Sequence, residues 1–492
     1  MLRSVFKLRQ IAVVRMLLKV GLGSVAALAN ADEQDELNAH AAIANAIVYP
    51  ADLYISSSSY TQNPYSGFPS SGDTQHVSES QLATHNVAQK WFSDGTWNVM
   101  SEASYVDQTG SNNFGYGVNI FAQTGFVAGF SFGGFFTIMN PVFASTLDPS
   151  DPLQQAQGLP VNQQITTQEL FTEYQFSNIV EANLGWIGVN NSPWLTYYQN
   201  NTLNLITYQG ISLNVHPGGG WLLTGLLLNG VQQLGSSDFN SQTFYGYNSV
   251  YSSGGLIAQD SSNASSGTAA LGANWSVPDN SFSFRLWGYQ FENYANLAYA
   301  DSTLKFVATD DLSFTIGMQG AIEGSGGGNV LENNGYGSAN SNMVGLMLGL
   351  DYSIFGIQIA YNNIWGPSTA YGGGDLVSPY TYQYASDPLY TTGWLAGMIE
   401  KSSAGSAYKI APSLSLLNSN LIIGPSYEYY ATSVSELIPT SIPATSEYDL
   451  QITYKIPQIK GLTIFAGSGY LLQPEDIGGN IYSGQVMVSY LY

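Results

Sequence analysis

The 492-residue sequence predicts an all-β fold, a transmembrane antiparallel up-and-down β-barrel of 18 strands. Segments of about ten residues alternate apolar and polar side chains, which gives each strand one lipid face and one wet face. Short turns alternate with longer polar loops, as in a barrel with periplasmic turns and extracellular loops. Only 9% of the residues are charged, whereas a soluble domain has about 25%. A secreted β-solenoid could share this composition, but no fixed short repeat is present.

The N-terminal 31 residues differ from the rest and predict a signal peptide. A basic region with Arg3, Lys7 and Arg9 precedes a short apolar stretch that ends in Ala29–Ala31, the expected cleavage site. Residues 32–83 are expected to form a helix followed by an irregular segment, placed either in the periplasm or in the lumen. Residues 84–492 are expected to form the barrel.

Charge and composition exclude several functions. The leader holds 5 of the 12 lysines and arginines and no acid, so the remaining chain has 7 basic and 34 acidic residues, a net charge of −27. Such a charge argues against nucleic acid as a partner. The chain has no cysteine, its four histidines are isolated, and no P-loop or G-x-S-x-G motif occurs. We therefore predict no enzymatic activity, no catalytic residues, no cofactor and no metal site.

The alternating segments define the expected strands. The clearest lies in 446–456, where Tyr448, Leu450 and Ile452 alternate with Glu447, Asp449 and Gln451. Strands are expected at 96–107, 114–123, 126–138, 167–176, 179–190, 206–216, 220–231, 267–277, 281–290, 297–308, 312–322, 343–353, 357–364, 406–417, 421–431, 446–456, 462–471 and 480–492. Tyr390–Glu400 also resembles a strand, but counting it as a crossing breaks the alternation of short and long connections. We assign it to the loop 365–405.

The last strand, Asn480–Tyr492, is expected to close the barrel by pairing with the first. Val486, Val488, Tyr490 and Tyr492 should face lipid, while Gln485 and Ser489 should face the pore. A terminal strand that ends in an aromatic residue also resembles the assembly signal of bacterial outer-membrane barrels. We assign that signal to Val488, Tyr490 and Tyr492.

Strand parity also predicts which polar side chains line the pore. They are mostly acids, with two basic residues: Glu102, Glu169, Glu173, Glu181, Arg285, Gln319, Glu428, Glu447, Asp449, Gln451 and Lys455. An acidic lumen lowers the energy of cations and repels anions, because the low-dielectric wall focuses the field. For any single residue, the simpler interpretation is that the acid only keeps the lumen hydrated.

Part of the sequence resembles the OprD-type outer-membrane porins. In Asn183–Val215, a strand with Gly185 leads to a loop with Pro193 and then to Thr207, Tyr208 and Gly210, as in that family. The segment Glu447–Leu472 and the last strand are similar to the family's final hairpin and terminal strand. The resemblance runs from about residue 90 to the end of the chain.

This resemblance implies an 18-stranded barrel, monomeric rather than trimeric, in the outer membrane of a Gram-negative bacterium. It implies passive diffusion of small hydrophilic solutes, often carboxylates, and partners that include membrane lipid, lipopolysaccharide and the barrel assembly machinery. The family's third extracellular loop folds inward, which here corresponds to Asn191–Leu205. Its aromatic and amide residues are the expected constriction: Pro193, Trp194, Tyr197, Tyr198, Gln199, Asn200, Asn201 and Asn204.

The chain departs from the family in one respect, because it lacks a ladder of arginines to guide anions. We therefore expect neutral or cationic solutes rather than carboxylates. An alternative is a barrel that takes up a siderophore or another ligand and carries an N-terminal periplasmic segment. The helical stretch Asp32–Val48 supports this alternative.

Overall fold

The computed structural model describes most of the chain after residue 90. The described residues are 91–92, 94–109, 111–145, 159, 162–195, 205–232, 237–241, 243, 245, 264–326, 329–380, 387–399, 403–433, 444–475 and 479–492. The predicted signal peptide and the predicted segment 32–83 lie outside this part, so both remain predictions. Within the described ranges, no helix has the length and apolar character needed to cross a membrane.

Eighteen strands account for most of the described residues: β1 (Thr96–Gln108), β2 (Ser111–Gln123), β3 (Phe130–Ser145), β4 (Gln164–Phe176), β5 (Val180–Ile187), β6 (Thr207–Gly218), β7 (Trp221–Gln232), β8 (Thr268–Ser276), β9 (Phe282–Phe291), β10 (Ala295–Thr309), β11 (Leu312–Ser325), β12 (Asn340–Tyr352), β13 (Phe355–Trp365), β14 (Gly405–Leu416), β15 (Leu421–Thr432), β16 (Thr445–Lys455), β17 (Leu462–Leu472) and β18 (Ile481–Leu491). A short helix, α7 (Val330–Asn333), and a 3-10 turn, η2 (Tyr371–Gly373), lie between strands.

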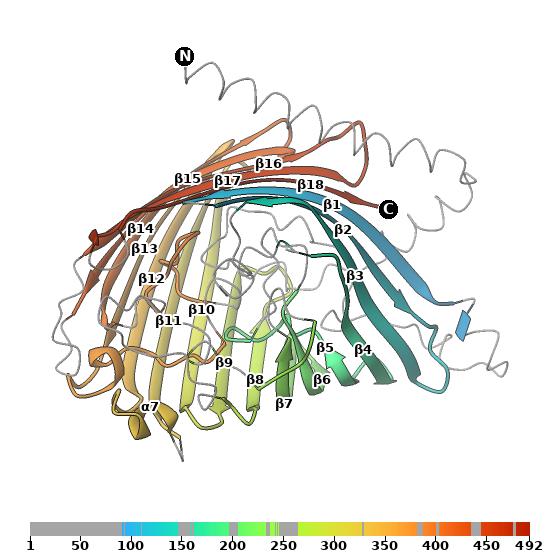
Figure 1. Ribbon diagram of the computed structural model, residues 1–492, viewed down its shortest axis with the longest axis horizontal. Coiled ribbons are helices and arrows are strands. Elements are labelled where there is room, and N and C mark those ends of the chain that lie inside the picture. Colours follow the sequence, from blue (N-terminus) through green and yellow to red (C-terminus); the bar gives the residue numbers. More distant parts are fainter. Residues whose placement is uncertain are drawn as a thin grey trace.

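The strands form one closed antiparallel barrel, which confirms the predicted fold. Each strand pairs with its sequence neighbours, and β18 also pairs with β1, so no edge is left open. The closing register runs from Met100 opposite Leu491 to Gln108 opposite Ser483. Figure 1 shows β18 between β17 and β1. The segment 390–399 crosses no wall and belongs to the β13–β14 connection, as expected.

The two faces of the barrel wall differ in the way that the alternation predicts. On β12, Leu346 and Leu348 point outward and are exposed, whereas Met343 and Met347 point inward and are buried. Exposed aliphatic residues also point outward on other strands around the barrel: Leu170, Ile211, Leu227, Leu271, Leu286, Ile316, Ile359 and Ile410. The outer face is therefore apolar, as an acyl-chain environment requires.

The connections at one end of the barrel are all short turns, and most of those at the other end are long. Two connections at the long-loop end are nevertheless tight. One joins Gln108 to Ser111 and the other joins Phe291 to Ala295. The second contains Asn293 at a φ of 70°, a left-handed conformation that asparagine tolerates better than most residues.

The glycine motif that marks the family resemblance has a structural reason. Gly185 on β5 lies directly opposite Gly210 on β6. Gly185 has a φ of 133°, and a Cβ there would lie 2.3 Å from the carbonyl oxygen of Leu170. Close backbone approach at this point of the wall therefore requires glycine.

The inner face is packed at the long-loop end and open toward the short-turn end. On β10, inward Tyr299 near the loop end is buried, but inward Lys305 near the turn end is exposed. On β12, inward Met347 is buried, whereas inward Asp351, nearer the turn end, is exposed. Described residues of the long loops, such as Trp194 and Met398, contribute to the packed half.

Candidate functional site in the barrel interior

Residues 387–399 of the β13–β14 connection, here called the inward segment, run along the inner wall. At one end the amide of Gln319 on β11 lies 2.8 Å from the carbonyl oxygen of Pro388. Asn362 on β13 then accepts hydrogen bonds of 3.1 Å from the main-chain N–H and the hydroxyl of Thr391. The segment continues past β14 and β15 to β16, and Leu395 and Ala396 pack against Leu471 of β17.

Three neighbouring strands supply a row of ionisable side chains beneath the inward segment. Lys409 on β14 is opposite Glu428 on β15, which is opposite Glu447 on β16. Asp449 occupies the next inward position on β16. Lys409 Nζ lies 3.0 Å from Glu428 Oε1, and both side chains are buried. We refer to these four residues as the β14–β16 cluster.

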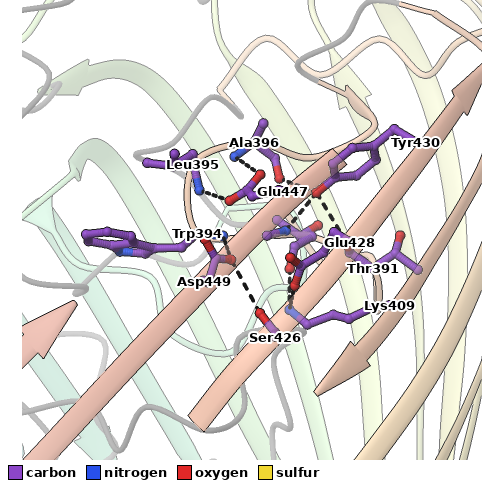
Figure 2. Close-up of polar contacts among 12 residues, drawn as sticks. Thr391, Trp394, Leu395, Ala396, Lys409, Ser426, Glu428, Tyr430, Glu447 and Asp449 are labelled. Carbon is purple, nitrogen blue, oxygen red and sulfur yellow. Dashed lines mark hydrogen bonds and ion pairs between the residues drawn. The ribbon is translucent and has the colours of Figure 1, made fainter. Parts of the chain in front are cut away.

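The cluster holds the inward segment by its main chain (Figure 2). Three consecutive N–H groups donate to carboxylates: Trp394 to Asp449 Oδ2 at 3.0 Å, and Leu395 and Ala396 to the two oxygens of Glu447. Lys409 Nζ donates to the Thr392 carbonyl oxygen at 2.6 Å. Charge-assisted bonds of this kind are stronger than neutral ones. The wall therefore clamps residues 392–396 inside the barrel.

Two further contacts complete the clamp. The Tyr430 hydroxyl on β15 donates to the Ala396 carbonyl oxygen at 2.7 Å and accepts from the Gly393 N–H at 3.1 Å. A Cβ at Gly393 would lie 2.6 Å from the Glu447 carboxyl carbon. Glycine at this position therefore allows the main chain to approach the wall.

The earlier part of the same connection crosses to strands further round the barrel. Val377 N–H donates to Glu323 on β11 at 2.8 Å, and Ser378 N–H donates to the Tyr245 hydroxyl at 2.9 Å. The ring of Tyr380 contacts Tyr208 on β6 and Phe291 on β9 edge to face. Burial raises the pKa of the Tyr245, Tyr380 and Tyr390 hydroxyls, so these loop groups stay neutral.

The start of the predicted constriction loop also folds over the inner wall. The Trp194 side chain is fully buried and packs edge to face on Tyr299 of β10, with ring centroids 5.9 Å apart. Ser192 shares a 2.9 Å hydrogen bond with Tyr289 on β9. Pro193 is buried between them. The other predicted constriction residues lie outside the described residues: Tyr197, Tyr198, Gln199, Asn200, Asn201 and Asn204.

An ion pair lies next to this loop. Arg285 on β9 makes a two-pronged contact with Asp301 on β10, the residue directly opposite. The Tyr299 hydroxyl donates to the same carboxylate at 2.8 Å. One of the rare positive charges of the interior is therefore neutralised locally and does not form part of a basic track.

Strands β1, β4 and β5 carry the remaining predicted acids. Glu102 on β1 accepts a 2.8 Å hydrogen bond from Asn119, and Glu173 on β4 accepts 2.6 Å bonds from Gln123 and Gln175. Glu169 and Glu181 are also inward and buried. Gln451 and Lys455 follow Glu447 and Asp449 along the inner face of β16 and are partly exposed. The predicted lining residues thus fall into two walls, β1–β5 and β14–β16, with Arg285 and Gln319 between them.

On the wall strands, sequence reasoning missed Lys409, Asp301 and Glu323 in the packed half, and Lys305 and Asp351 near the turn end. Parity could have identified the first two, since Lys409 alternates with outward Tyr408 and Ile410. Glu323 was assigned to a loop because the predicted strand ended at residue 322, whereas β11 continues to Ser325.

Sequence comparison finds no match for this chain, whereas comparison with solved structures finds similar folds. No family model matches the chain, and no curated protein matches it. The crystal structure of the Pseudomonas aeruginosa outer membrane protein OpdK is similar, with a TM-score of 0.65 and 13% identity over 82% of this chain and 99% of OpdK. P. aeruginosa OccD3 (OpdP) gives 0.65 and 14% over 88% and 99% of the two chains. P. aeruginosa OprD gives 0.61 and 13% over 84% and 98%. The resemblance to OprD-type porins is thereby confirmed at the level of the fold.

Proposed function

We propose that this chain is a divergent OprD-type porin that allows passive diffusion of small hydrophilic solutes across the outer membrane. A closed barrel with an apolar outer face and a polar inner face suits a channel through a bilayer. The fold is similar to outer-membrane proteins such as OpdK and OprD. On this proposal the chain is not an enzyme, and it works as a monomer in contact with outer-membrane lipid and lipopolysaccharide after insertion by the barrel assembly machinery.

The observation that carries the proposal is the asymmetric filling of the barrel. The inward segment and residues 191–195 pack against the inner wall at the long-loop end, while Lys305 and Asp351 are exposed on the inner face at the other end. A wide vestibule that leads to a narrowed, polar region is the arrangement a diffusion channel needs to discriminate among small solutes. We propose that both loop segments narrow the path, together with the predicted aromatic and amide residues of Asn191–Leu205.

Interior charge favours cationic and neutral solutes. Inward acids include Glu102, Glu169, Glu173, Glu181, Glu323, Glu428, Glu447 and Asp449. Arg285 and Lys409 are each paired with a carboxylate. A solved structure of OpdK contains vanillate, the anion of an aromatic acid. The acidic interior of this chain favours the opposite sign of charge.

Reversal potentials of single channels in a KCl gradient test this selectivity. We expect the sign of the reversal potential to show that K⁺ passes more readily than Cl⁻. We expect Glu102→Gln combined with Glu181→Gln to reduce this preference for K⁺. Lys460→Gln is the control. Lys460 lies in the short turn between β16 and β17, so this substitution removes no inward charge. Clear anion preference of the wild-type channel would contradict the proposed selectivity.

A further inference from the structure

Three carboxylates of the β14–β16 cluster converge on one point of the inner wall. We infer that Glu428, Glu447 and Asp449 bind a divalent cation, with Ca²⁺ the best chemical match. One oxygen from each of these side chains lies within 4.8 Å of one from each of the others, and all three side chains are buried. Since Ca²⁺ bonds oxygen at about 2.3–2.6 Å, two oxygens on the same ion are at most about 5 Å apart. The spacing therefore fits a shared ion.

Two carboxylate oxygens in this site could coordinate a cation. Glu428 Oε2 and Asp449 Oδ1 are buried and have no hydrogen-bond partner among the described residues. Buried carboxylate oxygens are normally hydrogen-bonded or coordinate a metal, because an unsatisfied charge in a low-dielectric site is costly. Lys409 lies on the Oε1 side of Glu428 and also donates to Thr392. It therefore leaves the Oε2 side open for an ion.

Charge balance points to a divalent ion. Three carboxylates and one ammonium carry a net charge of −2 in a buried site, and a single divalent cation makes the site neutral. Hard carboxylate oxygens select Ca²⁺ or Mg²⁺ over softer metals, and flexible ligation by carboxylates and water suits Ca²⁺. Protonation of two carboxylates would also neutralise the site and is the competing outcome of the test.

The same side chains hold the inward segment, so the ion would act on the loop. Asp449 accepts the Trp394 N–H on Oδ2, and Glu447 accepts the Leu395 and Ala396 N–H groups, one on each oxygen. A cation that fixes these carboxylates would fix the acceptors of the clamp. This inference goes beyond the proposed function, because cation binding can be measured whether or not the barrel conducts.

The test is calorimetric titration of Ca²⁺ into the folded, chelator-treated barrel in detergent. We expect one site in the wild type and at least ten-fold weaker binding in Glu428→Gln. Glu102→Gln changes an inward acid on β1, three strands from β16 and outside the cluster, and should bind as the wild type does. No saturable Ca²⁺ binding in the wild type, or equal binding in Glu428→Gln, would overturn the inference and favour protonated carboxylates.

Terbium luminescence supplies a second measurement at the same site. The main-chain nitrogen of Trp394 lies 3.0 Å from Asp449 Oδ2, so we expect this indole to sensitise bound Tb³⁺ and Ca²⁺ to displace it. Trp394→Phe should lose most of the sensitised emission and still bind Ca²⁺ in the calorimeter. If Glu428→Gln fails to fold, Glu428→Asp, which keeps the charge on a shorter side chain, should show weaker binding; unchanged binding would count against the site.

Discussion

Replacing Glu447 with glutamine should release the inward segment from the barrel wall. The carboxylate accepts the N–H groups of Leu395 and Ala396, one on each oxygen. Hydrogen bonds to a charged group contribute about 1.5–3 kcal/mol each, and a neutral bond contributes about 1 kcal/mol. Glutamine keeps one acceptor oxygen and turns an NH₂ group toward the other N–H. The net loss is therefore about 3 kcal/mol of local stability.

Amide hydrogen exchange measures this loss where it occurs. Since about 1.4 kcal/mol corresponds to a factor of ten in an equilibrium constant, exchange of the Leu395 and Ala396 amides should accelerate on the order of 100-fold. The measurement is made in chelator, so that any bound cation does not contribute. Amides in the paired strands β16 and β17 should keep their protection.

Glu102→Gln is the matched control for this prediction. Glu102 is also a buried inward acid, but it lies on β1, three strands from β16, and accepts its hydrogen bond from Asn119 on β2. This variant should leave exchange in 387–399 unchanged. If Glu447→Gln folds with unchanged exchange at residues 395 and 396, the clamp does not hold the segment and the reasoning fails.

Three other perturbations test the interior and the closure. Arg285→Met leaves buried Asp301 without its guanidinium partner and should lower the free energy of unfolding in urea by about 3 kcal/mol. Adding Asp301→Leu to this variant should recover most of the lost stability. No recovery would mean that the two residues are not coupled. Trp194→Ala empties a fully buried site and should cost roughly 3–5 kcal/mol in the same assay, so a loss below about 1 kcal/mol would show that the loop does not pack there. Deletion of Tyr490–Tyr492 removes the 2.9 Å bond from the Tyr492 N–H to the Val99 carbonyl oxygen and should reduce the amount of folded barrel in membranes; normal amounts would argue against a role in closure and assembly.

The strands could be predicted because apolar and polar residues alternate with a period of two along each strand of a barrel wall. Every side chain on a strand faces either lipid or the interior, so alternation identifies strand and face together. The count of 18 also required the correct assignment of Tyr390–Glu400, which resembles a strand by itself. Parity of the connections excluded it, and the part of it that the structure describes lies in the β13–β14 connection.

The interior contacts could not be predicted in the same way. The clamp uses main-chain N–H groups of residues 394–396, which any residue except proline provides, so no side-chain pattern marks them. Grouping Lys409 with Glu428 and Glu447 requires the register of three strands. Sequence separation alone does not give that register, and the packing of a long loop depends on contacts that only the closed barrel creates.

Conductance of the folded protein in a planar lipid bilayer tests the central claim most directly. We expect discrete, open-channel steps from the wild type and larger steps from Glu447→Gln, because release of the inward segment widens the narrowed half of the barrel. Heat-modifiable migration on a gel would establish beforehand that both proteins are folded. A folded wild-type barrel that conducts no ions, with Glu447→Gln equally silent, would contradict a diffusion channel.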